Sequence, residues 1–122
     1  MKKILFAVVL GLASVAASAS PGSDRCNALA TGVQKELPFE TDSITRLVGA
    51  TCSGETLTAI YVIHDVGDGK YIDWNVAYNI TKKEMCTNPN TVVYAGGNAH
   101  LVYNDTNGNL LHVFDISPED CK

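Results

Sequence analysis

Apolar residues recur every three or four positions near the start of the folded part, and this spacing predicts a helix. The predicted helix runs from Asp24 to Glu36, with Ser23 or Asp24 as its N-cap and Pro38 beyond its end. Its apolar positions are Cys26, Leu29, Ala30, Val33 and Leu37. Because they share one face, this helix should pack against a sheet through that face.

A second helix is predicted from Asp73 to Met85, after a break at Gly67 and Gly69. The residues that recur at helical spacing are Trp74, Tyr78, Thr81 and Met85. A strand over residues 71–80 is the competing interpretation, because aromatic and β-branched side chains also suit strands.

Four segments bounded by turn residues predict strands. Ile44–Cys52 and Thr56–His64 are separated by a short polar turn, and His100–Asn104 and Leu110–Ile116 flank an Asn-Gly pair at residues 107–108 that favours a tight hairpin. Thr56–His64 is apolar on both faces, which favours a central position. The predicted fold class is α+β: a small antiparallel sheet of about four strands in two hairpins, with an N-terminal helix and a middle helix on one face.

The first nineteen residues have the pattern of an export signal. Two lysines occur in residues 1–3, an apolar run covers residues 4–15, and small residues at Ala17 and Ala19 predict cleavage before Ser20. The apolar run is shorter than the roughly 20 residues of a membrane-spanning helix. We therefore expect a bacterial protein that is periplasmic or secreted, with no stable membrane insertion after the signal is removed.

The charge of the mature chain is acidic. Without Lys2 and Lys3, thirteen acidic residues face seven basic ones, so the net charge moves from −4 to about −6. This balance argues against a nucleic-acid partner or an anionic lipid surface, because both need a concentrated positive face. Lipid attachment is not expected either, because the first cysteine, Cys26, follows Asp24 and Arg25 rather than a small-residue box.

All four cysteines, Cys26, Cys52, Cys86 and Cys121, lie in the mature part. An even number of cysteines in a small exported chain predicts two disulfides, and none of them has the C-x-x-C spacing of a redox pair or a zinc site. Three pairings are possible. We favour Cys26–Cys52 and Cys86–Cys121, because each bond would join a helical segment to a strand that follows it. Residues 20–122 should then form a single disulfide-stabilised domain.

Several short segments occur in an order that resembles a recurrent group of small exported bacterial proteins of unknown function. The segments are Leu37-Pro38, Asp42-Ser43-Ile44-Thr45, Cys86-Thr87-Asn88-Pro89, Tyr103-Asn104-Asp105 with Gly108, and Asp120-Cys121. The chain departs from the group at Asn104, where a Tyr or Arg is usual before the aspartate. The resemblance implies the α+β architecture and a Cys86–Cys121 bond, but no catalytic residue. More distantly, the chain is similar to the small α+β pilotins that chaperone secretins of type II secretion and are typically lipoproteins.

The sequence gives little support for a metal or cofactor site. His64, His100 and His112 lack H-x-x-x-H or H-x-H spacing, so we predict no metal and no cofactor. The segment Asp105–Gly108 lacks the spacing and the distant glutamate of a calcium loop, which favours a plain hairpin.

An enzymatic site is not predicted. Asp65, Asp68 and Asp73 lie near a glycine-rich loop, so a small hydrolase or inhibitor-like module acting through this loop is the alternative interpretation. The mature chain offers little cleft, and no Ser-His-Asp order is present. We assign no catalytic residue and expect a protein that is not an enzyme.

A binding role remains. Tyr71, Trp74 and Tyr78 lie on or beside the second predicted helix, and partly exposed aromatic residues of this kind favour a contact patch. The competing interpretation is that Trp74 and Tyr78 seal the helix onto the sheet. We predict a non-enzymatic binding or assembly module that contacts another protein of the cell envelope. The oligomeric state stays open.

Overall fold

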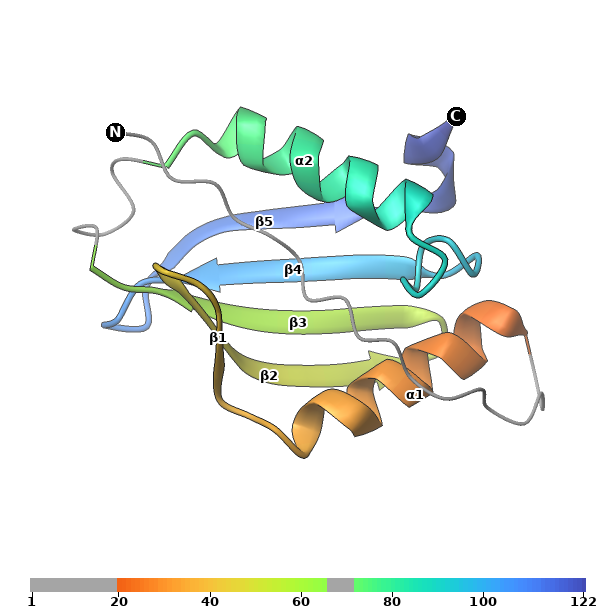
Figure 1. The fold of residues 1–122 in the computed structure, drawn as a ribbon, viewed down its shortest axis with the longest axis horizontal. Helices are drawn as coiled ribbons and strands as arrows, with labels where there is room; N and C mark the ends of the chain where they lie inside the picture. Colours follow the sequence, from red (N-terminus) through yellow and green to blue (C-terminus); the bar gives the residue numbers. More distant parts are fainter. Residues whose placement is uncertain (1–19, 66–71) are drawn as a thin grey trace.

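The computed structural model describes residues 20–65 and 72–122, which form a five-stranded sheet and two α-helices (Figure 1). The elements are α1 (Pro21–Gln34), β1 (Phe39–Asp42), β2 (Thr45–Ser53), β3 (Thr56–Ile63), α2 (Trp74–Thr87), β4 (Asn98–Asn104), β5 (Leu110–Ile116) and the 3-10 helix η1 (Pro118–Cys121). The predicted α+β class is confirmed. Within these residues no helix is both long and apolar enough to cross a bilayer.

The sheet differs from the prediction in strand number and in direction. β1 is a fifth strand, before the first predicted strand segment, and it pairs with the start of β2, where Glu40 lies opposite Arg46. The strands follow one another in the order β1 to β5, but β3 and β4 are parallel. The sheet is therefore mixed. The reason is that α2 lies in the connection between β3 and β4, and such a crossover brings the second strand back in the same direction.

The helix α1 begins three residues earlier than predicted. Ser20 is the N-cap, its hydroxyl oxygen accepts a hydrogen bond from the Ser23 amide at 3.1 Å, and Pro21 occupies the first turn. At the other end, the Gln34 side-chain amide donates to the Ala50 carbonyl at 2.7 Å. This bond satisfies a β2 carbonyl that lies beyond the residues paired with β1.

The segment after Asp73 forms the helix α2, which confirms the helical interpretation and not the strand interpretation. Its N-cap is Asp73, whose carboxylate accepts from the Val76 amide at 3.2 Å. Its buried residues, Ala77, Thr81 and Met85, are four positions apart and face the sheet.

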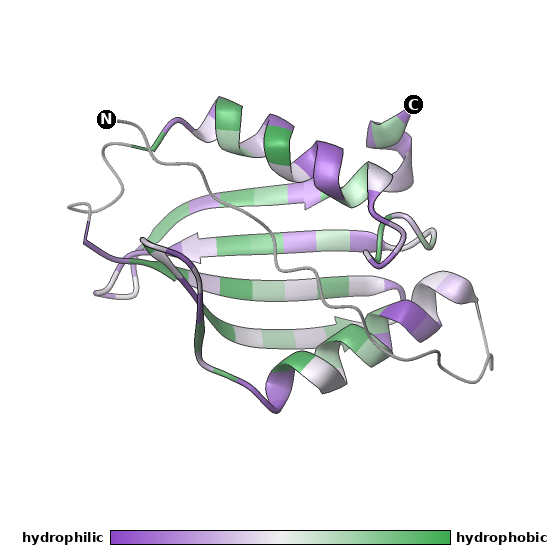
Figure 2. Ribbon diagram, in the orientation of Figure 1, coloured by the Kyte–Doolittle hydropathy of each residue, from purple (hydrophilic) through white to green (hydrophobic). Residues whose placement is uncertain are grey.

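One face of the sheet carries the core. Along β3, the residues Leu57, Ala59, Tyr61 and Ile63 are buried, whereas the residues between them are only half-buried. Both helices pack on this inner face (Figure 1). Figure 2 shows the resulting alternation of apolar and polar positions along the strands. The prediction that β3 is central is confirmed, but in the described structure its second face has no helix over it.

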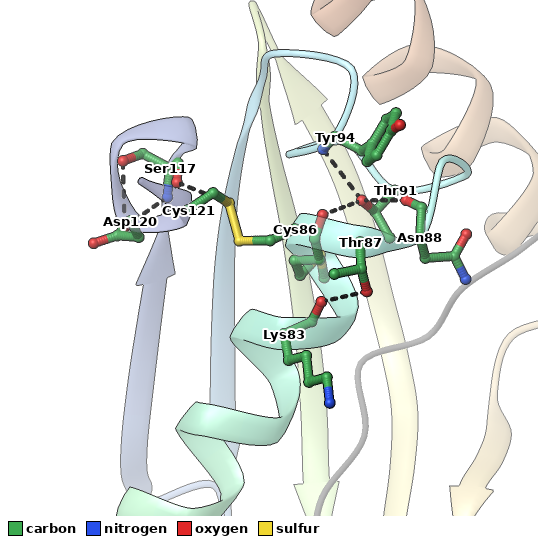
Figure 3. Close-up of a disulfide and its surroundings, with 10 residues drawn as sticks. Lys83, Cys86, Thr87, Asn88, Thr91, Tyr94, Ser117, Asp120 and Cys121 are labelled. Carbon is green, nitrogen blue, oxygen red and sulfur yellow. Dashed lines mark hydrogen bonds between the residues drawn. A yellow bond between two sulfur atoms is a disulfide. The ribbon is translucent and has the colours of Figure 1, made fainter.

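Both preferred disulfides are present. Cys26–Cys52 joins α1 to the strand β2, as predicted, whereas Cys86–Cys121 joins the end of α2 to the 3-10 helix η1 and not to a strand (Figure 3). Next to the second bond, the Thr91 hydroxyl donates to the Met85 carbonyl at 2.6 Å. These contacts tie the C-terminal turn and the loop after α2 to the same helix end.

The β4–β5 connection is a hairpin, as predicted, but its loop spans residues 105–109 and is not a tight turn with positive φ at both Asn107 and Gly108. Gly108 has φ +86°, the left-handed conformation that glycine adopts without strain. Asp105 is buried, and its carboxylate accepts from the Asn107 amide at 2.9 Å and from the Asn109 amide at 2.8 Å. The loop's own N–H groups therefore organise this carboxylate.

Candidate binding site

The two helices cover opposite halves of the inner sheet face. α1 packs on β2 and β3, whereas α2 packs on β5 and η1 (Figure 1). Between the helices lies a cavity of about 20 Å³, which we call the inter-helix cavity. It is lined by Leu29, Val33, Leu47, Ala50, Leu57, Ala59, Tyr61, Met85 and Leu101, which come from both helices and three strands.

The inter-helix cavity has apolar walls. Leu29 and Val33 face it from α1, Met85 faces it from α2, and all three are almost completely buried. A space of this size admits at most a water molecule, and its walls offer water few polar partners. A ligand larger than a water molecule can enter only if the two helices move apart. Each helix is tied to the rest of the fold by a disulfide at one end. The last turn of α1 is also held by the hydrogen bond from Gln34 to the Ala50 carbonyl.

Three buried polar atoms lie on or beside this inner face and have no hydrogen-bond partner among residues 20–65 and 72–122: Asp42 Oδ2, Thr45 Oγ1 and the Tyr103 hydroxyl. The Tyr103 ring stacks on Tyr61 with the centroids 4.8 Å apart. Burial raises the pKa of Tyr103 well above its usual value, with smaller contributions from Tyr61 and Asp42. Buried polar atoms without partners are uncommon in native proteins, so this end of the inner face is energetically costly.

The predicted contact patch lies partly in the packing beneath α2. Trp74 stacks on His112 with a centroid separation of 4.7 Å, and the Tyr78 ring meets Phe114 edge-on at 5.5 Å. Both α2 residues are half-buried. These contacts hold α2 against β5, as the competing interpretation of the helical spacing of Trp74 and Tyr78 predicts. Tyr71 lies outside the described residues.

His64 joins two carboxylates at one corner of the sheet. Its Nδ1 lies 2.6 Å from an Asp65 oxygen, its Nε2 lies 2.5 Å from Glu40, and Glu40 also pairs with Arg46 at 2.6 Å. The Asp65 hydrogen bond, followed by that of Glu40, raises the pKa of His64, although burial opposes the rise. The hydrogen bonds from Arg46 and then from His64 lower the pKa of Glu40.

The candidate metal and hydrolase residues are not brought together in the part that the structure describes. Of the other histidines, His100 pairs with Asp115 at 2.5 Å and His112 stacks on Trp74. No group of three or more His, Cys, Asp or Glu in the described ranges could hold a metal ion. Of the aspartates named in the hydrolase hypothesis, Asp73 caps α2 in the structure, and Asp68 lies outside the described residues.

A larger cavity, of about 360 Å³, lies where β5 runs into η1, and we call it the terminal cavity. Its lining residues are Thr56, Asn98, Ala99, His100, Asp115, Ile116, Ser117 and Asp120. Of these residues, His100 and Asp115 were candidate metal ligands from the sequence alone. The set spans β3, β4, β5 and η1, so only the strand order brings it together.

Comparison with known proteins gives matches in structure but not in sequence. No protein-family model and no curated protein sequence matches this chain. The type II secretion system pilotin AspS from Vibrio cholerae aligns with a TM-score of 0.65 and 18% identity over 82% of this chain and 92% of its own. The pilotin EpsS of the type II secretion system of Vibrio vulnificus gives 0.64 and 14% over 83% and 88%. A Pseudomonas aeruginosa protein described as secreted gives 0.67 and 10% over 83% and 93%.

These matches confirm a pilotin-like fold, which the distant resemblance in the sequence had implied. At 10 to 18% identity the likeness concerns the fold alone. The short sequence segments shared with the group of unknown function are not tested by it.

Proposed function

We propose that this chain is a non-enzymatic binding module that holds a short apolar segment of a cell-envelope protein between α1 and α2. The observation that carries the proposal is the inter-helix cavity, whose apolar lining comes from both helices and from the sheet beneath them. A segment entering there would separate the helices and cover the apolar lining with its own side chains. Clefts between packed elements that expose apolar walls are suited to such segments.

Two further observations support a binding role in the envelope. The fold is similar to that of two type II secretion pilotins and of a protein described as secreted. The sequence begins with the pattern of an export signal, and both disulfides suit an oxidising compartment. We therefore propose a partner within the envelope, belonging to secretion machinery.

The test is site-specific photo-crosslinking in intact cells. A photoreactive amino acid replaces Ile80, which is half-buried on the flank of α2 that faces away from Tyr78 and Lys82. The matched control places the same probe at Lys83, which is exposed on the same helix. We expect the Ile80 probe to crosslink to one envelope protein and the crosslinked peptide to be an apolar segment.

Mass spectrometry of the crosslinked peptide decides the outcome. Equal crosslinking from Ile80 and Lys83, or crosslinks from Lys83 alone, would contradict the inter-helix site. Circular dichroism of each purified probe variant confirms that it is folded before the crosslinks are compared. A second probe at Val33 of α1, opposite Met85 across the cavity, should give the same peptide as Ile80.

A further inference from the structure

The terminal cavity has the size of a small-ligand pocket, and two acidic side chains contribute to its lining. Its volume is about 360 Å³, at the lower end of the range for sites that take a small molecule or one or two side chains. Two carboxylates, Asp115 and Asp120, line it, and no Lys or Arg of the described residues does. The neighbouring Lys122 already pairs with Glu119 at 2.9 Å. The cavity therefore has negative charge without a strong cation to balance it.

Each carboxylate is held in place through one oxygen. Asp115 Oδ1 lies 2.5 Å from His100 Nδ1, and Asp120 Oδ2 accepts from the Ser117 amide at 2.8 Å and from its hydroxyl at 3.2 Å (Figure 3 shows the Ser117–Asp120 contacts). In the described residues the second oxygen of each carboxylate accepts no hydrogen bond. Two positioned acceptors of this kind match a guanidinium or ammonium group, which carries several donors.

Apolar atoms continue from the cavity along the open face of the sheet. Ala99 and Ile116 also contribute to the lining, but their side chains alternate with those of the open face and belong to the buried core. Two residues further along the strands from His100 and Asp115, Val102 lies opposite Val113, and Ile60 lies beside Val102 on β3. These three side chains are half-buried and have no described helix over them. An acidic cavity thus adjoins a short aliphatic row.

The spacing of the two features fits an extended polypeptide. Residues two apart along a strand are separated by roughly 7 Å, which is also the distance between alternate side chains of an extended ligand. An arginine or lysine can lay its alkyl chain on apolar atoms and place its charged head at the carboxylates.

We propose that the terminal cavity binds the basic side chain of an extended partner segment in which an arginine or lysine is followed, two residues later, by an aliphatic residue. The basic head lies between Asp115 and Asp120, and the aliphatic side chain covers Val102 and Val113. Anionic ligands are disfavoured by the carboxylates. This site does not depend on the inter-helix cavity, because the aliphatic row is on the opposite face of the sheet.

The test is titration of the isotope-labelled mature protein with a synthetic peptide, followed by amide NMR. The probe is acetyl-Arg-Ser-Val-Ser-amide, and its matched control replaces arginine with citrulline, a neutral side chain of almost the same shape. We expect the arginine peptide to shift the amides of His100, Asp115 and Ser117 together with those of Val102 and Val113. The affinity of the citrulline peptide should be lower by a factor of about ten or more, because its hydrogen bonds are not charge-assisted.

Two charge variants locate the site. Asp115→Asn should weaken the arginine peptide about ten-fold, and it should fold normally because the Asp115 side chain is 72% exposed. Glu36→Gln removes one negative charge from an exposed position near the end of α1 and should leave the affinity unchanged. Circular dichroism of both variants confirms folding.

Three results would overturn the proposal. The first is equal affinity for the arginine and citrulline peptides. The second is a set of shifted amides that lies outside the terminal cavity and the aliphatic row. The third is spermidine binding as tightly as the peptide with no shift at Val102 and Val113, which would assign the cavity to a free polyamine.

Discussion

The indole of Trp74 stacks on the imidazole of His112, with the ring centroids 4.7 Å apart and the planes 12° apart. This contact joins the first turn of α2 to β5, and Trp74 also meets the edge of Phe114. Trp74→Ala should therefore lower the free energy of unfolding by about 2 to 3 kcal/mol, less than for a fully buried tryptophan. Urea denaturation followed by far-ultraviolet circular dichroism measures the change.

The control for this prediction is Tyr94→Ala. The Tyr94 side chain is 55% exposed, and no ring contact of it is found within the described residues, so its loss should change stability by less than about 0.5 kcal/mol. If both variants were equally stable, Trp74 would contribute little to packing, and the hypothesis that it belongs to a contact patch would gain support.

A second prediction concerns Gly97, which lies just before β4. A Cβ atom there would lie 2.5 Å from the Glu55 carbonyl oxygen and 2.8 Å from a Val92 methyl carbon. The approach is close because Glu55 O also accepts the amide of Asn98 at 2.8 Å. Gly97→Ala should lower the free energy of unfolding by about 1 to 3 kcal/mol, measured by urea denaturation.

Gly49→Ala is the matched control for Gly97→Ala. At Gly49 the nearest atom to an added Cβ is Ile60 Cδ1 at 3.5 Å, an ordinary contact, and the backbone does not have a positive φ. We expect a change within about 0.5 kcal/mol. A Gly97→Ala protein as stable as Gly49→Ala would contradict the close packing at Glu55.

The local features of this fold could be predicted, because they depend on neighbouring residues. The three-and-four spacing before Gln34 and after Asp73 marks both helices, and the Asn107-Gly108 pair marks the last hairpin. The start of α1 was missed because Ser20 and Pro21 follow the signal directly, although a proline after a serine is a helix-start pattern. The edge strand β1 was missed because it is short and polar.

The way the hairpins join could not be predicted from periodicity. Two hairpins in sequence can meet antiparallel or parallel, and the choice depends on where the intervening helix packs. Here α2 crosses over, so β3 and β4 run parallel and Tyr61 lies beside Tyr103. Which residues line the two cavities also depends on helix packing and strand order. Leu29 and Met85 look like ordinary core positions in the sequence, and Thr56 and Asp120 meet at the terminal cavity only through the order of the strands.

The Tyr103 hydroxyl gives a third prediction. The side chain is completely buried, and its oxygen has no hydrogen-bond partner in the part of the chain that the structure describes. Tyr103→Phe keeps the stacking on Tyr61 and removes a desolvated polar group, so the free energy of unfolding should stay the same or rise. Tyr103→Ala should lower it by about 3 to 5 kcal/mol, because a large cavity is left. Thermal and urea unfolding of the two variants separate these effects, and a loss above about 1 kcal/mol in Tyr103→Phe would show that the hydroxyl has a partner in solution.

The last prediction concerns the pH dependence that His64 confers. Because Asp65 and Glu40 raise the pKa of His64 in the folded state, the folded protein binds its proton more tightly than the unfolded chain does. The stabilisation is complete below about pH 6.5, the ordinary pKa of histidine, and is lost as the pH rises through the raised value. Between about pH 6 and pH 8.5, the stability of the wild type should therefore fall relative to that of His64→Gln. Urea denaturation of both proteins at each pH measures the difference. Glu40→Gln removes one of the two carboxylates and should reduce this pH dependence, whereas a difference that stays constant across the range would show that the His64 ion pairs do not stabilise the fold.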